Sequence, residues 1–267
     1  MLKTRILTAL VLLPLMLAAL FFFPPHAWAA FSWLIIGLAL WEFCRMAAIA
    51  GVQQWAYLAA CTALAGLAWW AGYMPGALTM SISLLVWLVL APMWLRKRWP
   101  IPTGIPAMLL GVLLMFPAWF AFLAWHPDNS AISGKQLLAV MGLVWVADVA
   151  AYFAGKTFGK HKLAPAISPG KSWEGVVGAI VGVAAYVWFV NDLGWLNIPL
   201  PLAVLLPLAM GLTAVSVVGD LLESWFKRSA GIKDSSSLLP GHGGVYDRID
   251  SLIAVLAVSH ALRLLLA

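Results

Sequence analysis

Long apolar runs, separated by short segments rich in polar residues, Pro or Gly, cover almost the whole chain. The runs are continuous and about 20 residues long, without the alternation of apolar and polar positions that strands of a membrane barrel show. They predict transmembrane helices, because a helix satisfies all its backbone polar groups inside hydrocarbon. The predicted spans are 5–23, 27–45, 53–72, 76–95, 104–125, 137–155, 173–191, 199–222 and 249–267.

The composition agrees with this class. Hydrophobic residues make up 64% of the 267 positions and charged residues only 10%, which is incompatible with a soluble globular domain. The first run follows Lys3 and Arg5 as the core of a signal peptide would, but at residues 6–23 it is longer than the ~7–15 residues typical of such a core. We therefore interpret it as a span. Cys44 and Cys61 lie in apolar stretches without paired spacing, so we interpret both as packing residues.

The basic residues predict the orientation. With the N-terminus in the cytoplasm, all sixteen Lys and Arg residues except Lys135 and Arg263 fall in cytoplasmic segments. This asymmetry follows the positive-inside rule and favours an odd number of spans, with the C-terminus outside. The fold class is thus an all-α polytopic membrane protein with about nine transmembrane helices. Its net charge of +6 would lie on the face that meets anionic lipids and nucleotide phosphates.

The two halves of the chain differ in their acidic residues. Only Glu42 and Asp128, of ten Asp and Glu residues, precede position 146. We expect the first half to anchor the protein and the second half to carry the chemistry. The predicted division is 1–135 for membrane-anchoring helices and 136–267 for catalytic helices, the latter with cytoplasmic loops 156–172 and 223–248.

The densest charge lies where the last two spans meet the cytoplasm. Four polar residues at i, i+3, i+4 and i+7 share one helix face at the end of the eighth span, namely Asp220, Glu223, Ser224 and Lys227. The last span opens with Asp247, Asp250 and Ser251 at similar spacings. Between them, the glycines of the turn at residues 240–244 permit unusual backbone geometry and close approach of a ligand.

Both signs of charge suit a phosphate substrate. Carboxylate oxygens favour Mg²⁺, which completes its shell with water and substrate phosphate oxygens. Lys and Arg neutralise the remaining phosphate charge, so the pattern predicts phosphoryl or nucleotidyl transfer. The alternative is a neutralised salt-bridge cluster that closes the bundle, which the glycine-rich turn disfavours.

A second polar cluster lies upstream, at residues 145–175. Asp148 is about 10 Å below the predicted interface, and Tyr152 follows one turn later on the same face. An acid at that depth marks a functional site, although a hydrogen bond to a neighbouring helix is the simpler alternative. Ser168 and Lys171 lie in the loop that starts the next span, where hydroxyl groups and a cation suit a phosphate or a ribose.

Two further interpretations, a P-loop and a zinc site, are not supported by the sequence. The segment from Gly155 to Thr157 resembles the end of a P-loop, but Ala150 stands where the first glycine is required. His242 is the single His in the charged turn, with no His or Cys at zinc spacing, so we do not expect zinc. His242 would more simply bond a phosphate oxygen or the backbone, and acid catalysis stays open.

Residues 224–250, SWFKRSAGIKDSSSLLPGHGGVYDRID, resemble the signature of the phosphatidate cytidylyltransferase, or CDP-diacylglycerol synthase, family over their whole length. Residues 148–175 also resemble that family's upstream segment, whereas the first half matches only in being hydrophobic. The resemblance implies transfer of CMP from CTP to phosphatidate, giving CDP-diacylglycerol and pyrophosphate for phospholipid biosynthesis at the cytoplasmic face.

The resemblance also implies a metal centre at Asp220 and Asp247, holding Mg²⁺ with a second metal ion left open. Lys227, Arg228 and Arg248 are the further catalytic candidates, since cations stabilise the departing pyrophosphate. The remaining candidates, for substrate binding, are Asp148, Tyr152, Ser168, Lys171, Ser224, Lys233, Asp234, His242, Gly243, Gly244 and Asp250.

The expected partners are CTP, phosphatidate and membrane lipids, with no nucleic acid and with a homodimer left open. We expect an integral protein of the bacterial inner membrane, with its active site on the cytoplasmic side. The closest alternative is a related membrane nucleotidyltransferase or lipid kinase that acts on another lipid. A transporter is disfavoured, because it would place charges at several depths and in both halves of the chain.

Overall fold

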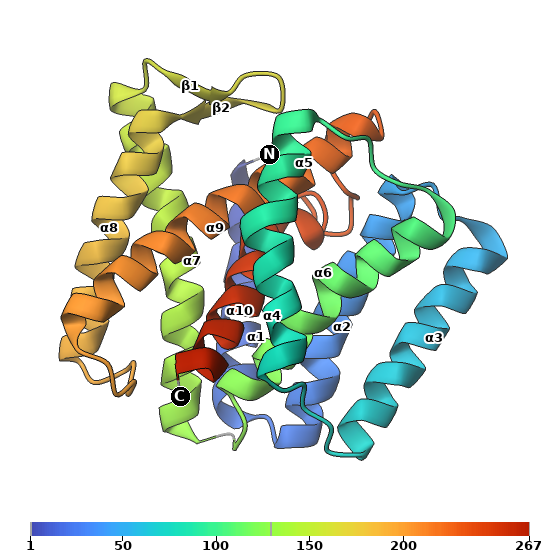
Figure 1. The fold of residues 1–267 in the computed structure, drawn as a ribbon, viewed down its shortest axis with the longest axis horizontal. Coiled ribbons are helices and arrows are strands. Elements are labelled where there is room, and N and C mark those ends of the chain that lie inside the picture. Colours follow the sequence, from blue (N-terminus) through green and yellow to red (C-terminus); the bar gives the residue numbers. More distant parts are fainter. Residues whose placement is uncertain (1, 129, 267) are drawn as a thin grey trace.

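The computed structural model describes residues 2–128 and 130–266, and side chains from residue 7 onward, so the side chains of Lys3 and Arg5 lie outside the described part. The described chain is almost entirely helical (Figure 1). Its α-helices are α1 (Leu2–Phe22), α2 (Pro25–Met46), α3 (Gly51–Trp70), α4 (Ala77–Leu85), α5 (Ala91–Lys97), α6 (Gly104–Trp125), α7 (Ala131–Phe158), α8 (Trp173–Asp192), α9 (Leu202–Ser229) and α10 (Tyr246–Leu266). One π-helical segment, η1 (Val86–Leu90), joins α4 to α5.

Every predicted span coincides with one helical rod, with α4, η1 and α5 forming a single rod over Ala77–Lys97. Among the described residues, seven helices are long and apolar enough to cross a membrane, and they are the rods other than α1 and α3. The prediction of an all-α polytopic membrane protein is therefore confirmed. The count of nine spans and the orientation of the termini stay predictions.

Helix α10 lies at the centre of the bundle. Its side chains are buried on all faces from Ser251 to Ala261, because it packs against α9, α6, α4, α7 and α2. A helix that is apolar all round is typical of such a core position. Figure 1 shows α3 and α8 on opposite sides of the molecule; most side chains of α3 and one face of α8 are exposed there and suited to lipid.

Small residues allow α8 to pack very closely on α7. Gly178 and Gly182 lie on one face of α8, and a Cβ at Gly182 would come within 2.7 Å of the Ala150 Cβ. A Cβ at Gly178 would collide with Ala154. Glycine and alanine at a helix contact are a common way for membrane helices to approach each other.

A short hairpin follows α7, within the segment 156–172 that we predicted as a cytoplasmic loop. Strand β1 (Lys162–Ala164) pairs antiparallel with β2 (Ser168–Ser172), with Lys162 opposite Ser172. Strand β2 leads directly into α8, whose first turn is capped by the Ser172 hydroxyl, which accepts a hydrogen bond from the Gly175 amide at 3.2 Å.

The helices also run further into the predicted loops than the apolar pattern indicated. Helix α9 continues to Ser229, and α10 begins at Tyr246, so the connection between them is residues 230–245 rather than 223–248. Likewise α7 extends to Phe158. Hydropathy locates where an apolar run ends, whereas a helix can continue into water on polar residues that it aligns on one face.

The hairpin and residues 230–245 lie at one end of the bundle, which we call the polar end (Figure 1). The first residues of α1 lie towards this end, and the last residues of α10 lie at the opposite end. Lys135, near the start of α7, and Arg263, in the last turn of α10, lie away from the polar end. This arrangement agrees with the charge asymmetry of the sequence.

Candidate active site

A cavity of about 590 Å³ opens between α7, the hairpin, α8 and α9. Small residues, including Ala151, Gly155 and Gly175, form part of its wall and leave the space free of side chains. Five of the predicted site residues line it, namely Asp148, Tyr152, Ser168, Lys171 and Asp220. The structure thus joins the upstream cluster to the end of α9.

An ion pair crosses this cavity. The Lys171 Nζ, on β2, lies 2.5 Å from Oδ2 of Asp220 on α9, and the two side chains are 23% and 30% exposed. The other oxygen of Asp220 accepts a hydrogen bond from the Ser224 hydroxyl at 3.2 Å. Because Lys171 and Asp220 stay accessible, both can exchange this pairing for a charged ligand.

Further carboxylates surround this ion pair. Asp148 on α7 lies close enough to interact electrostatically with Asp220, Lys171 and Arg248. Asp250 on α10 interacts with Asp220 and Lys171 in the same way. Three carboxyl groups beside two cations repel one another when ionised, so their arrangement suits a metal ion or a further cationic group.

The contact between α9 and α10 explains how carboxylates from both helices meet. A Cβ at Gly219 would lie 2.9 Å from the carbonyl oxygen of Asp250, so only glycine permits this approach. One turn away, the Ser251 hydroxyl donates to the carbonyl of Ser216 at 3.0 Å. Asp220, the next residue after Gly219, is therefore held beside the start of α10.

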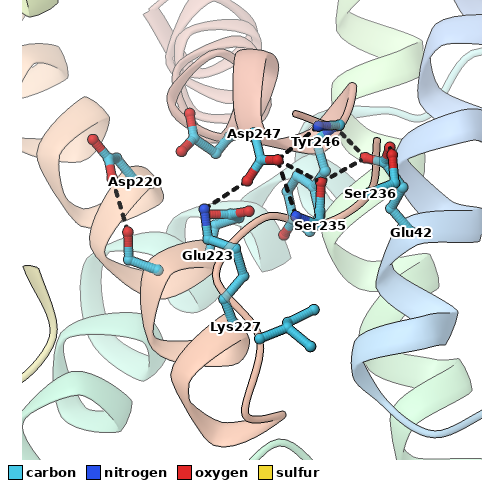
Figure 2. A network of polar contacts seen from close by, with 12 residues as sticks. Glu42, Asp220, Glu223, Lys227, Ser235, Ser236, Tyr246 and Asp247 are labelled. Atoms are coloured by element: carbon cyan, nitrogen blue, oxygen red, sulfur yellow. Dashed lines mark hydrogen bonds and ion pairs between the residues drawn. The ribbon is translucent and has the colours of Figure 1, made fainter. Parts of the chain in front are cut away.

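Lys227 occupies a second, buried cluster (Figure 2). Its Nζ lies 2.7 Å from Oε2 of Glu223 and 2.6 Å from Oδ1 of Asp247, and these side chains are 12%, 0% and 3% exposed. The ammonium group is thus bound by two carboxylates. In this structure it is a bridge between α9 and α10, while its predicted role in phosphate binding stays a prediction.

Asp247 also holds the connection between these helices. Its Oδ2 accepts hydrogen bonds from the Ser235 amide at 3.0 Å and the Gly244 amide at 2.7 Å, and the Ser235 hydroxyl lies 2.9 Å from it. Figure 2 shows Asp247 between Lys227 and Ser235. One lone pair of Oδ1 is taken by Lys227, so Oδ1 has room for another partner.

The glycine-rich turn has the geometry that its sequence indicated. Gly241 and Gly243 have φ angles of 77° and 84°, in the left-handed region that favours glycine. The Leu239 amide donates to the Gly243 carbonyl at 2.8 Å, which closes the turn. A Cβ at Gly243 would also lie 2.7 Å from Oδ2 of Asp247, so this glycine lets the turn approach the carboxylate.

The other predicted site residues lie around this turn. Arg228 Nε donates to the Ile167 carbonyl at 3.4 Å, which links α9 to the hairpin. Three predicted residues, Lys233, Asp234 and Arg248, are exposed, and His242 is half-buried. The structure therefore divides the predicted residues into those at the cavity and those that shape or flank the turn.

Sequence reasoning missed Glu42 of α2. Its carboxylate accepts hydrogen bonds from Ser235 and Ser236 in the connection, and from the amides of Val245 and Tyr246 (Figure 2). A signal was present, since an acid inside a predicted span is a candidate for function. The sequence-based division assigns the first half of the chain to anchoring and therefore gives Glu42 no role in the site.

The carboxylates at the cavity fit a magnesium ion that arrives with a phosphate substrate. Over residues 2–128 and 130–266, no group of three or more His, Cys, Asp or Glu side chains can hold a metal by itself. Mg²⁺ needs only one or two carboxylates where substrate phosphates and waters complete its shell. Asp220 presents such an oxygen to the cavity, and Asp148 lines the same space.

The fold and this site define a class: a polytopic membrane protein with a charged cavity at one end of its helical bundle. The model of the cytidylyltransferase family matches residues 3–266, and the chain belongs to that family. A phosphatidate cytidylyltransferase of Pseudomonas aeruginosa is 42% identical, over 98% of this chain and 97% of that protein. A protein of the same name from Haemophilus influenzae is 36% identical over 95% and 96%. The resemblance found in the signature segment is thereby confirmed over the full chain.

Proposed function

We propose that this chain transfers CMP from CTP to phosphatidate, giving CDP-diacylglycerol and pyrophosphate for phospholipid biosynthesis. The observation that carries the proposal is the similarity, over almost the whole chain, to two proteins named phosphatidate cytidylyltransferase. The activity requires a site for a triphosphate and a lipid phosphate together, and the cavity at the polar end supplies both charge signs for them.

The lining of the cavity suits two substrates of different polarity. Val176 and Val217 contribute apolar wall, whereas Lys156, Lys162 and Lys171 contribute positive charge. A two-tailed lipid comes from the bilayer and CTP comes from water, so a cavity near the end of the helices is accessible to both. We place the polar end at the cytoplasmic face of a bacterial inner membrane, as the basic residues there and the bacterial relatives favour.

In the proposed reaction, a phosphate oxygen of phosphatidate attacks the α-phosphorus of CTP. A new O–P bond forms there, and the bond from the α-phosphorus to the bridging oxygen of the β-phosphate breaks, so that pyrophosphate leaves. No strong general base is required, because a phosphomonoester is already largely ionised near neutral pH. Lys171, which lines the cavity, and Arg248, which interacts electrostatically with Asp148 in its wall, stabilise the phosphate charge.

Asp220 and Asp247 are our proposed ligands for Mg²⁺. Asp220 lines the cavity, whereas Asp247 is 3% exposed outside the lining and would bind the ion through Oδ1 once its contact with Lys227 opens. When bound, the ion would neutralise phosphate charge during transfer. Asp148 would help to keep the cation and the phosphates at the same end of the cavity, since it interacts electrostatically with Asp220 and Lys171.

The purified protein in detergent tests this proposal with labelled CTP, Mg²⁺ and one of two acceptors. We expect labelled CDP-diacylglycerol with phosphatidate and no labelled lipid with a polyprenyl phosphate. A labelled product from the polyprenyl phosphate alone would overturn the substrate assignment.

A further inference from the structure

Glu42 is a completely buried carboxylate outside the cavity, and its exposed fraction is 0%. Its Oε1 accepts from the Ser236 hydroxyl at 2.5 Å and the Val245 amide at 3.0 Å. Its Oε2 accepts from the Tyr246 amide at 2.6 Å, and the Ser235 hydroxyl, 2.9 Å away, can donate its single proton either to this oxygen or to Asp247. These four donors come from two short segments that are about 200 positions away along the chain.

Two hydroxyls and two backbone amides surround the Glu42 carboxylate, and each of these four groups can donate to one of its oxygens. The two amides belong to Val245 and to Tyr246, the first residue of α10, where the helix has unsatisfied N–H groups and a positive dipole end. Glu42 thus caps α10 from a different helix, α2.

This cap is connected directly to the site. The Ser235 hydroxyl lies 2.9 Å from Oε2 of Glu42 and 2.9 Å from Oδ2 of Asp247, so one side chain joins both carboxylates (Figure 2). Asp247 and Asp250 lie in the first turns of the helix that Glu42 caps. A change in the place of Glu42 would therefore displace both aspartates.

Other contacts from the first half of the chain act on the same connection. Arg45, one turn after Glu42 on α2, donates from Nη1 to the Ser235 carbonyl at 3.0 Å. The Thr8 hydroxyl of α1 donates to the Pro240 carbonyl at 2.9 Å. Gly244 is required by this packing, since a Cβ there would collide with the Glu42 carboxylate and the Ser235 hydroxyl.

We infer that Glu42 is a positioning residue for the transfer reaction: it fixes residues 235–236 and the start of α10, and thereby sets the place of Asp247 and Asp250. This inference rests on the proposed function for its effect on turnover. Its effect on the order of residues 233–246 is independent of what the enzyme makes.

Two substitutions test whether Glu42 acts through its carboxylate or only fills space. Glu42→Gln keeps the size of the side chain, but its NH₂ group would face a backbone amide, of Val245 or of Tyr246, that cannot turn round to accept. Glu42→Asp keeps the charge and removes one methylene. A residue that only fills space would tolerate Gln better than Asp, whereas a carboxylate that caps a helix would tolerate Asp better.

The matched control is Ser32→Ala, because Ser32 is equally buried on α2 but bonds only to the Ala29 carbonyl of its own helix, at 3.1 Å. Each variant is purified in detergent, and three quantities are measured: thermal unfolding, amide hydrogen exchange over residues 233–246, and kcat/KM for CTP. For Glu42→Gln we expect faster exchange in that segment and a kcat/KM about tenfold to a hundredfold lower, the cost of opposing a donor in a charged hydrogen-bond network. Glu42→Asp should lie between Gln and the unchanged protein, and Ser32→Ala should match the unchanged protein.

Exchange and kcat/KM within twofold of the unchanged protein in Glu42→Gln would overturn the inference, as would a higher rate for Gln than for Asp. If Glu42→Gln does not fold, Ser236→Ala replaces it, since this change removes one of the four donors without burying a new polar group. Slower turnover together with faster local exchange in Ser236→Ala would support the inference. No change in either quantity would overturn it. If the unchanged protein makes no CDP-diacylglycerol, the proposed function fails, while the exchange data still decide the role of Glu42 in ordering the segment.

Discussion

Lys227 is bound by two carboxylates that are themselves buried, and this makes its charge important for stability. Glu223 is 0% exposed and Asp247 is 3% exposed, so neither can turn to water if the ammonium group is removed. Taking one partner from a buried ion pair leaves a charge without compensation, which costs more than the pair itself contributes.

We predict that Lys227→Met destabilises the protein by about 3–5 kcal/mol, the usual range for a buried charge left unpaired. Unfolding of the purified protein in detergent, followed by circular dichroism, measures the effect. The double variant Lys227→Met with Glu223→Gln should recover part of the stability, because it removes one of the uncompensated carboxylates. An unchanged unfolding midpoint in the single variant would contradict the buried ion pair.

For individual residues, the sequence predicted which side chains belong to the polar clusters, but it did not predict which of them contact each other. The upstream candidates and Asp220 do line one cavity. Lys227, however, contacts carboxylates. These contacts depend on how α9 packs against α10. That packing requires the close approach of the two helices at Gly219, which a hydropathy pattern does not reveal.

Among the elements, the pair formed by α7 and α8 determines the shape of the cavity. The two helices carry Asp148 and the wall from Gly175 to Ala179, and their spacing is set by glycines that meet alanine methyl groups. A larger side chain at this contact would separate the helices and move Asp148 relative to Lys171 on the hairpin.

We predict that Gly178→Ala lowers both the unfolding midpoint and the rate of CDP-diacylglycerol formation, because its Cβ would collide with Ala154. The control is Gly66→Ala on α3, where a new Cβ would have nothing within 4 Å. Removing a flexible glycine there should leave stability unchanged or raise it by about 0.5–1 kcal/mol. Equal behaviour of the two variants would contradict the close packing of α7 on α8.

The helices themselves were largely predictable, because a continuous apolar run satisfies its backbone polar groups inside a membrane by forming a helix. Their ends were not. The helical part of α9 beyond residue 222 consists of polar and aromatic residues that the apolar pattern does not mark, and the hairpin is too short for a strand pattern. The π-helical segment η1 lies just before Pro92, which has no amide N–H, and its position follows from local backbone geometry rather than hydropathy.

For the whole molecule, the division into an anchoring half and a catalytic half is incomplete as a description of function. Helix α2 holds the connection between α9 and α10 through Glu42 and Arg45. These contacts join residues separated by about 190 positions, and no local pattern could have paired them. The first half therefore contributes to the order of the site as well as to membrane insertion.

Orientation is a property of the whole molecule too, and it can be tested with single cysteines in a protein whose own Cys44 and Cys61 are buried. We predict that Ser237→Cys, at the polar end, reacts with a membrane-impermeant maleimide in inside-out vesicles but not in spheroplasts. Asn191→Cys, at the end of α8 away from the hairpin, should show the opposite pattern. Both positions are exposed in the structure. Labelling from the reversed sides would contradict the positive-inside assignment.

We propose that CTP and phosphatidate react in the cavity that contains Lys171 and Asp220. The most direct measurement is the rate of labelled CDP-diacylglycerol formation by purified Asp220→Asn, with Asp192→Asn, an exposed aspartate at the far end of α8, as the control. We expect Asp220→Asn to fold and insert normally but to lose turnover by at least about a hundredfold, as loss of a charged group at the reacting phosphates would cause, whereas Asp192→Asn keeps the full rate. A near-normal rate for Asp220→Asn would contradict this proposal.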